Sequence, residues 1–321
     1  MSERYFIVRR ARPTMGVMAN LRELQKQFLE YLEVEKNRSV KTAENYDRYL
    51  KRFLAVSGAK KATDITDERV RRYRLALARI ANPRRKALKK QTQFYHLVAL
   101  RSFLKYLAKR DVQSLAAEKV ELGKLPAREI EFMESEELAR LLAAPKGDAP
   151  ESLRDRAILE LLFSTGLRVS ELVSLDRETI NLKKGEFSVR GKGDKIRVVF
   201  LSDAAKLALT SYLAARGDID AALFTRVRAG SEASDAGLRL TARSVERMVR
   251  KRAAEAGITK KVTPHGLRHA FATDLLSSGA DLRSVQMLLG HAQITTTQIY
   301  THFTDKTLRD IHKRFHGKSR N

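Results

Sequence analysis

The sequence predicts a mostly helical protein of two domains with one small antiparallel sheet. Its 321 residues exceed the usual size of a single domain. Apolar residues recur at spacings of three and four along most of the chain, which is the period of amphipathic helices. Two segments, 186–190 and 195–200, stand out as strands, and the glycines on either side of Lys192 suit a tight hairpin between them.

The first third of the chain predicts a basic arm at residues 1–18 and a helical bundle at residues 19–110. The arm lacks a helical period, whereas each of the four helices expected after it has one apolar stripe. Packing these helices into a bundle removes the stripes from water. The stripes are Leu21, Leu24, Phe28 and Leu32; Ala43, Tyr46, Leu50 and Phe53; Val70, Tyr73, Leu77 and Ile80; and Leu97, Leu100, Leu104 and Leu107.

Residues 111–130 lose the helical period and contain Gly123 and Pro126, so they are predicted to be a linker. The second domain is expected at residues 131–321. It begins with a helix at Ser135, where acidic side chains in the first turn are favoured by the helix dipole. Further helices are predicted at 153–163, 203–215 and 241–256.

The segment 263–300 is predicted to contain two well-capped helices. Thr263 can cap a helix that has Pro264 in its first turn, a position where the missing N–H of proline needs no partner. After a short loop, a second helix at 282–289 is expected to end at Gly290, because glycine readily adopts the left-handed conformation of a helix C-cap. A third, short helix is expected to carry the tyrosine at the end of the segment.

The tail of the chain predicts one more helix. Leu308, Ile311 and Phe315 follow three-and-four spacing and form one apolar stripe with basic residues around it. So short a helix is marginal alone and has to bury its stripe against another surface. The spacing leaves open whether that surface lies on the same molecule or on a second copy.

The charge of the chain indicates a polyanionic partner. The net charge is +25, and the first 110 residues contain 28 Lys and Arg against 10 Asp and Glu. Nucleic acid fits such a field, although ribosomal proteins and membrane-surface binders share it. No run approaches the ~18 apolar residues of a membrane span, and the charged N-terminus has no apolar signal core. With no cysteine, the chain has no disulfides or thiolate zinc sites, and we expect a cytoplasmic protein without a membrane contact.

Cations are densest between the third and fourth predicted helices, where the loop reads PRRKALKK. A charge run is commonly a solvated face. Here a second group of cations lies just upstream, which favours contact with the phosphates of DNA. The cations are Arg84, Arg85, Lys89 and Lys90 in the loop, and Arg69, Arg71, Arg72 and Arg74 in the helix before it.

Arg168 is the first candidate for a phosphate-binding side chain at a reaction centre. Gly166 breaks the preceding helix, so Arg168 is expected in the first turn of the next one, where its guanidinium and the helix dipole act together. Glu171 is placed to hold Arg168 in one rotamer, although a surface ion pair of little energetic weight is the alternative. Lys192 at the hairpin tip is either a solvated turn residue or, if desolvated in a DNA groove, a proton donor.

The C-terminal segment supplies the remaining candidates, which are His265, Arg268, His291 and Tyr300. Hydrogen-bond donors to an anionic oxygen, followed by one hydroxyl nucleophile, suit phosphoryl transfer without a metal. Tyr300 has an alternative as an ordinary core tyrosine. Neighbouring cations lower the pKa of a phenol and favour its use as a nucleophile.

A zinc site is the alternative use of this segment. His265 and His269 are four residues apart, as in an H-E-x-x-H helix, but Gly266 occupies the position of the glutamate. No carboxylate is suitably placed to replace it. We therefore predict no metal and no cofactor, and we expect His269 to pack or to bond a backbone carbonyl.

Taken together, these motifs resemble the tyrosine site-specific recombinases, the lambda-integrase-like enzymes, and within them the Xer type. The resemblance covers nearly the whole chain after the arm. The matching motifs are STGLRVSEL, GKGDK, TPHGLRHAFAT and LLGHAQITTTQIY followed by TH.

The resemblance implies a role for each candidate. Arg168 and Arg268 would clamp the scissile phosphate, and His265 and His291 would donate hydrogen bonds to its oxygens. Lys192 would protonate the 5′-oxygen leaving group while Tyr300 attacks phosphorus. The family also implies a 3′-phosphotyrosyl intermediate and a Holliday junction, without metal or ATP.

The fold implied by the resemblance is a C-shaped clamp on duplex DNA, built from a helical SAM-like N-terminal domain and a catalytic domain. The expected partners are duplex DNA with paired half-sites and three further copies of the chain, which form a tetramer through the C-terminal tail. A DNA-translocase activator is a further candidate partner. Xer-like resolution of chromosome dimers is the preferred role. The alternatives are an integrase of a phage or mobile element, a non-catalytic DNA-binding regulator and a type IB topoisomerase.

Overall fold

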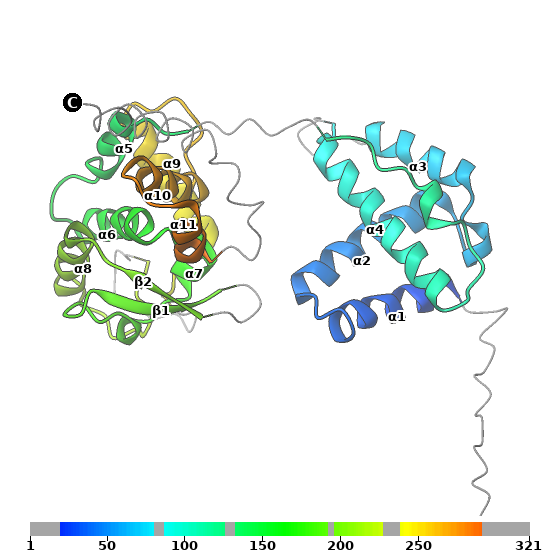
Figure 1. The fold of residues 1–321 in the computed structure, drawn as a ribbon, viewed down its shortest axis with the longest axis horizontal. Helices are drawn as coiled ribbons and strands as arrows, with labels where there is room; N and C mark the ends of the chain where they lie inside the picture. Colours follow the sequence, from blue (N-terminus) through cyan, green and yellow to red (C-terminus); the bar gives the residue numbers. More distant parts are fainter. Residues whose placement is uncertain (1–19, 80–86, 126–131, 192–195, 227–237, 291–321) are drawn as a thin grey trace, which may run out of the picture. The chain divides into compact units, whose positions relative to one another are not determined.

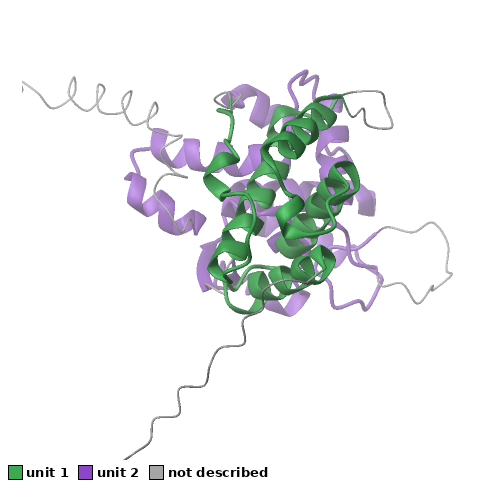
Figure 2. Ribbon diagram, turned by 90° about the vertical axis from the view of Figure 1, so that its right-hand side faces the viewer, with its two compact units in different colours: residues 1–128 green, residues 129–321 purple. Residues whose placement is uncertain are grey.

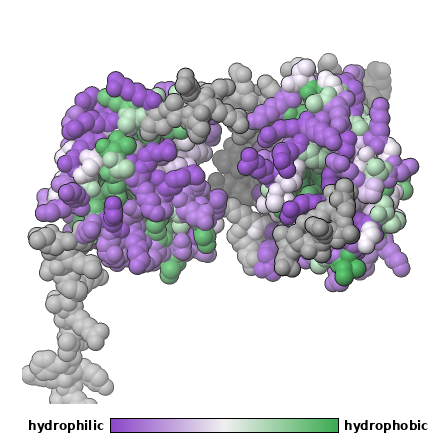
Figure 3. All heavy atoms as spheres, turned by 180° about the vertical axis from the view of Figure 1, so that it is seen from behind, coloured by the Kyte–Doolittle hydropathy of each residue, from purple (hydrophilic) through white to green (hydrophobic). Residues whose placement is uncertain are grey.

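The computed structural model describes residues 20–79, 87–125, 132–191, 196–226 and 238–290. The chain forms two compact units, residues 1–128 and 129–321, drawn in green and purple in Figure 2. The visible face of each unit is mostly hydrophilic, with scattered apolar patches (Figure 3). Within the described ranges, no helix is long and apolar enough to span a bilayer.

The described part of the N-terminal unit is helical, and the four α-helices in it confirm the four predicted ones (Figure 1). The described residues of the predicted stripes other than Ala43 lie in or against one core, where Phe28, Tyr73 and Phe103 are almost fully buried, and Ala43 is buried as well. Amphipathic periodicity was therefore sufficient to find these helices and their buried faces. Their bounds are α1 Leu21–Val34, α2 Val40–Ser57, α3 Asp67–Arg79 and α4 Lys90–Lys109.

Part of the segment predicted as a linker packs on this core. A 3₁₀ turn at Ala117–Lys119 buries Ala117, and Val120 directly after it is also buried. Val112, Leu115 and Leu122 pack against the same core from partly buried positions. Irregular backbone has no apolar period, so this packing leaves no signal in the sequence.

Where the structure describes it, the C-terminal unit is mostly helical and contains one two-stranded antiparallel sheet, as predicted. In the sheet Glu186 pairs with Phe200 and Arg190 with Ile196. The elements are α5 Ser135–Leu142, α6 Pro150–Thr165, α7 Val169–Val173, β1 Glu186–Arg190, β2 Ile196–Phe200, α8 Asp203–Ala214, α9 Ala242–Glu255, α10 Pro264–Ser277 and α11 Leu282–Leu289.

Helix α6 forms the centre of this unit. It contacts α5, α8, α10 and β2, and Ala157, Ile158, Leu161 and Leu162 on it are completely buried. A helix that is apolar on several sides belongs in the interior of a domain. The C-terminal end of α6 is thereby held rigidly in the core, and the candidate site begins at that end.

Candidate active site

The turn after α6 places Arg168. Gly166 ends α6 with a φ of 59°, the left-handed conformation that glycine favours. A Cβ atom at this position would lie 2.5 Å from the ring of Phe271 on α10, so a larger residue would also clash there. Arg168 is the N-cap of α7, one position before the first turn in which we expected it. Its backbone N–H donates to the Glu171 carboxylate at 2.9 Å.

Glu171 is a buried carboxylate that binds two guanidinium groups. It accepts from Arg168 Nη1 at 2.7 Å, and from Arg197 Nη1 at 3.1 Å and Arg197 Nη2 at 2.7 Å. Burial alone would raise the pKa of Glu171, but hydrogen bonds from Arg197 and Arg168 outweigh it and hold this pKa at about 2. With 5% of its side chain exposed, Glu171 is not part of a surface ion pair. The carboxylate is therefore ionised at neutral pH and fixes the Arg168 side chain.

Arg197 was missed in the sequence analysis. It lies on β2, where Val199, two residues on, faces the core and is buried. Alternate residues of a strand point to the same side, so an arginine in register with a buried valine signals a buried partner. That partner is Glu171 on α7, and the side chain of Arg197 is 9% exposed.

Arg268 on α10 is buried, with 2% of the residue exposed. Its Nη1 donates to the carbonyl of Gly166 at 2.6 Å, and its Nη2 donates to the carbonyl of Leu289 at 2.5 Å. Both acceptors are carbonyls at helix ends, which lack partners within their own helices. The Arg268 guanidinium therefore joins the end of α6 to the end of α11. Its two acceptors, Gly166 and Leu289, precede Arg168 and His291 by two residues each.

Helix α10 begins as predicted. Thr263 is its N-cap and accepts a hydrogen bond from the N–H of Gly266 at 3.1 Å, with Pro264 in the first turn. His265 is exposed in that turn. Its Nε2 lies 3.0 Å from Nε2 of His269, and the two rings meet edge to face. His269 thus contacts His265, and the packing or carbonyl contact that we expected of it stays a prediction.

Helix α11 and its C-cap also confirm the prediction. The helix ends at Leu289, and Gly290 has a φ of 64°. His291 and Tyr300 follow this cap but lie outside the described residues, as does Lys192 between β1 and β2. Of the predicted reaction centre, the structure thus describes Arg168, Glu171, His265 and Arg268. Among the residues described, no three His, Asp or Glu side chains cluster in a way that could hold a metal ion.

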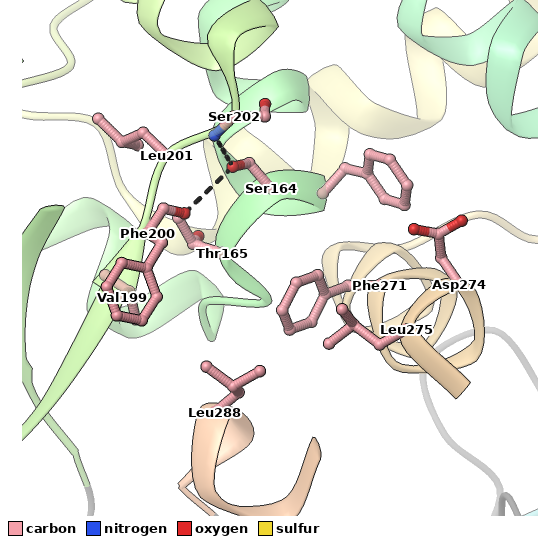
Figure 4. Close-up of a pocket in the computed structure, with 11 residues that line it drawn as sticks. Ser164, Thr165, Val199, Phe200, Leu201, Ser202, Phe271, Asp274, Leu275 and Leu288 are labelled. Atoms are coloured by element: carbon pink, nitrogen blue, oxygen red, sulfur yellow. Dashed lines mark hydrogen bonds between the residues drawn. The ribbon is translucent and has the colours of Figure 1, made fainter. Parts of the chain in front are cut away.

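An apolar pocket of about 380 Å³ lies beside this site (Figure 4). Phe271 and Leu275 of α10, Leu288 of α11 and Phe200 of β2 point into it, and the carboxylate of Asp274 lies near its edge. The hydroxyl of Ser164 donates to the Phe200 carbonyl at 3.3 Å and accepts from the N–H of Ser202 at 2.7 Å. The pocket wall is therefore formed by the same elements that position Arg168 and Arg268.

The predicted DNA-binding cations are only partly described. Arg71 makes a bidentate ion pair with Glu68 at 2.8 and 2.9 Å, and Arg72 lies 3.4 Å from the same carboxylate. Lys89 and Lys90 are exposed where α4 begins. Arg84 and Arg85 lie outside the described residues. Arg71 and Arg72 therefore share one neutralising carboxylate.

Sequence comparisons identify the family to which this arrangement belongs. The sequence model of the phage integrase family matches residues 131–307, which contain every candidate catalytic residue. The chain belongs to the phage integrase family. This tyrosine recombinase also matches the family's N-terminal SAM-like domain over residues 26–111. Enzymes of this family cleave and rejoin DNA, and so does this chain.

Relatives of this tyrosine recombinase cover nearly its full length. It is 38% identical to tyrosine recombinase XerC of Pelobacter propionicus, over 94% of this chain and 98% of the relative. It is 37% identical to tyrosine recombinase XerD of Halalkalibacterium halodurans, over 91% and 97%. A crystal structure of XerA recombinase is 32% identical and covers 92% of this chain and 99% of its own, with a TM-score of 0.50. A lambda integrase dimer bound to a core site shares the fold at 18% identity, over 87% and 97%, with a TM-score of 0.67.

Proposed function

We propose that this enzyme is an Xer-like site-specific recombinase that exchanges strands between paired half-sites and resolves chromosome dimers in the cytoplasm. The observation that carries the proposal is the shared anchoring of two guanidinium groups. Arg268 bonds the carbonyl of Gly166, and Arg168 follows two residues later, locked by the buried Glu171. Relatives named XerC and XerD match over more than nine-tenths of the chain, which favours the Xer role over a phage or mobile-element integrase.

The proposed reaction follows from the chemistry of the residue types. Arg168 and Arg268 bind the scissile phosphate, because a guanidinium fork matches phosphate oxygens. His265 and His291 donate further hydrogen bonds, which spread the charge that develops on those oxygens. Tyr300 attacks phosphorus, and Lys192 protonates the departing 5′-oxygen. The phosphotyrosyl diester conserves the energy of the broken bond, so rejoining requires neither ATP nor a metal.

Selecting bound DNA from a random library tests the assignment. We expect two inverted half-sites separated by a short spacer, together with Holliday junctions when two such sites are mixed. A single operator without junctions would identify a regulator. Relaxation of supercoils by a monomer without synapsis would identify a type IB topoisomerase. Joining of two unlike attachment sites, with no exchange between identical ones, would identify an integrase of a mobile element.

We expect the cations before α4 to contact DNA phosphates. Replacing Arg84, Arg85, Lys89 and Lys90 by glutamine should weaken site binding and reduce the slope of log K against log salt by about 0.9 for each phosphate that is no longer neutralised. Gel-shift titrations at several salt concentrations measure this slope. Lys109→Gln is a matched control, because Lys109 ends the same helix, roughly 28 Å from Lys90 at about 1.5 Å per residue. Equal slopes for the quadruple variant and the wild type would mean that the loop is only solvated.

The C-terminal tail is proposed to dock on a neighbouring copy in a tetramer. Its stripe of Leu308, Ile311 and Phe315 needs an apolar surface. The pocket between α6, β2, α10 and α11 offers one, and the exposed carboxylate of Asp274 beside it complements the basic tail. Exchange of tails between copies would couple the state of one site to the next.

Truncation before Leu308 should leave single-site binding nearly intact and abolish synapsis. Phe200→Asp, which places a charge at the edge of the pocket, should have the same effect from the acceptor side. Mixing the two variants should restore part of the synapsis, because the tail of one can occupy the pocket of the other. Gel-shift and junction assays measure both steps. Failure of the mixture, together with loss of single-site binding by the truncated protein, would indicate docking on the tail's own domain.

A further inference from the structure

Arg197 binds two separate elements of the candidate site through one guanidinium group. Its two Nη atoms bind the two carboxylate oxygens of Glu171 at 3.1 and 2.7 Å. Its Nε donates to the carbonyl of Leu288 at 3.1 Å. One planar group thus binds a side chain on α7 and a backbone atom in the last turn of α11.

Only arginine can make this set of contacts. The guanidinium presents its donors in a fixed plane, which allows two parallel bonds to a carboxylate and a third bond from Nε. A lysine has one ammonium group and cannot reach both acceptors with the same geometry. The contact is also dry, because the side chains of Arg197 and Glu171 are 9% and 5% exposed.

Gly290 brings the end of α11 close to Arg197. A Cβ atom built at Gly290 would lie 3.0 Å from Cδ of Arg197, closer than side chains normally approach. The glycine therefore both ends α11 and makes room for the arginine. The residue after it is His291, and Arg197 itself follows the hairpin tip that contains Lys192.

We propose that Arg197 is a positioning residue for DNA cleavage. It holds Glu171, and through Glu171 the guanidinium of Arg168, in register with the end of α11 from which His291 follows. This inference rests on the role proposed above for Arg168. All three guanidinium nitrogens of Arg197 donate to Glu171 or to the carbonyl of Leu288, so the inference gives Arg197 a supporting role and no contact of its own with the phosphate.

The test is the rate of covalent adduct formation on a nicked site, measured in a single turnover with enzyme in excess. Arg197→Met and Arg197→Lys should each slow this rate by about 10- to 100-fold with little change in site binding, since a small misplacement of a catalytic group has an effect of that order. Arg197→Lys keeps the charge and the aliphatic stem, so it shows whether charge alone suffices and remains informative if Arg197→Met does not fold.

A double-mutant cycle with Glu171→Gln separates positioning from general stability. If Arg197 acts through Glu171, the Arg197→Met, Glu171→Gln double variant should cleave no more slowly than the slower single variant. Arg252→Met is the matched control, because Arg252 is equally buried and binds the buried Asp155 at 2.7 Å. Arg252→Met should lower the melting temperature while leaving cleavage unchanged well below that temperature. When it is combined with Glu171→Gln, the losses of stability of the two variants should add.

Two results would overturn the inference. One is cleavage at the wild-type rate by Arg197→Lys and Arg197→Met. The other is an Arg197→Met, Glu171→Gln double variant whose fold-reduction in cleavage rate equals the product of the fold-reductions of the two single variants. Either result, obtained while the wild-type enzyme forms its tyrosyl adduct, leaves the proposed function intact. Absence of the adduct in the wild type would instead refute the proposed function.

Discussion

A Tyr300→Phe variant is expected to bind its DNA site with wild-type affinity and to form no covalent adduct with it. The substitution removes only the hydroxyl that would attack phosphorus and keeps the aromatic ring, so recognition of the site should be unaffected. Incubation with a nicked site, followed by denaturing electrophoresis, measures the adduct. EDTA should not change the wild-type yield, because Arg, Lys and His side chains supply the charge stabilisation in the proposed reaction.

Tyr212→Phe is the matched control for this experiment. Tyr212 is the other tyrosine of the C-terminal unit. It is buried, and its hydroxyl accepts from the N–H of Thr225 at 3.2 Å. We expect this variant to lose some stability and to retain the adduct. A normal adduct yield from Tyr300→Phe, or loss of the adduct in folded Tyr212→Phe, would reassign the nucleophile.

Arg168→Ala and Arg268→Ala are both expected to reduce cleavage by at least about 10²- to 10³-fold, because each removes a donor to the charge that develops on the phosphate. Their effects on stability should differ. Arg268→Ala leaves the carbonyls of Gly166 and Leu289 without this donor in a buried site. The free energy of unfolding should fall by about 1–3 kcal/mol for each carbonyl. In Arg168→Ala, Glu171 keeps its bidentate pair with Arg197, so the loss of stability should be smaller.

Thermal unfolding and single-turnover cleavage of the two variants measure this contrast. Arg268→Lys extends the comparison, because it keeps the charge but cannot donate to both carbonyls with one planar group. It should recover little cleavage and only part of the stability. Equal melting temperatures for Arg168→Ala and Arg268→Ala would show that the two carbonyl contacts of Arg268 add nothing to the fold.

The local structure of this protein could be predicted because its signals are local. The stripe of Leu97, Leu100, Leu104 and Leu107 indicates one buried helix face, and α4 buries all four. Thr263 and Gly290 are a helix start and a helix end for reasons that involve only neighbouring backbone atoms. Arg168, Glu171 and Arg268 were proposed as site residues in the same way, from residue type and spacing.

The contact between Glu171 and Arg168 was predicted, because the two residues are three apart in the chain. The partners of Arg268 and Arg197 could not be predicted, because they are distant in the chain. The carbonyl acceptors of Arg268 belong to Gly166 and Leu289, which are 102 and 21 residues away from it. Backbone carbonyls are present at every position, so no residue type marks the two that are used. Arg197 reaches Glu171 across 26 residues, and its alternation with Val199 shows that it faces inward without showing what it meets.

The sequence by itself determined the described helices, their caps, the two paired strands and the residue types proposed for the reaction centre. Each of these depends on interactions within a few residues, where spacing translates directly into geometry. The tertiary structure alone decided that Glu171 is buried between two guanidinium groups and that Arg197 joins β2, α7 and α11. Burial and long-range hydrogen bonds depend on how α6, α10, α11 and the hairpin pack together, and that packing sets the electrostatics of the site.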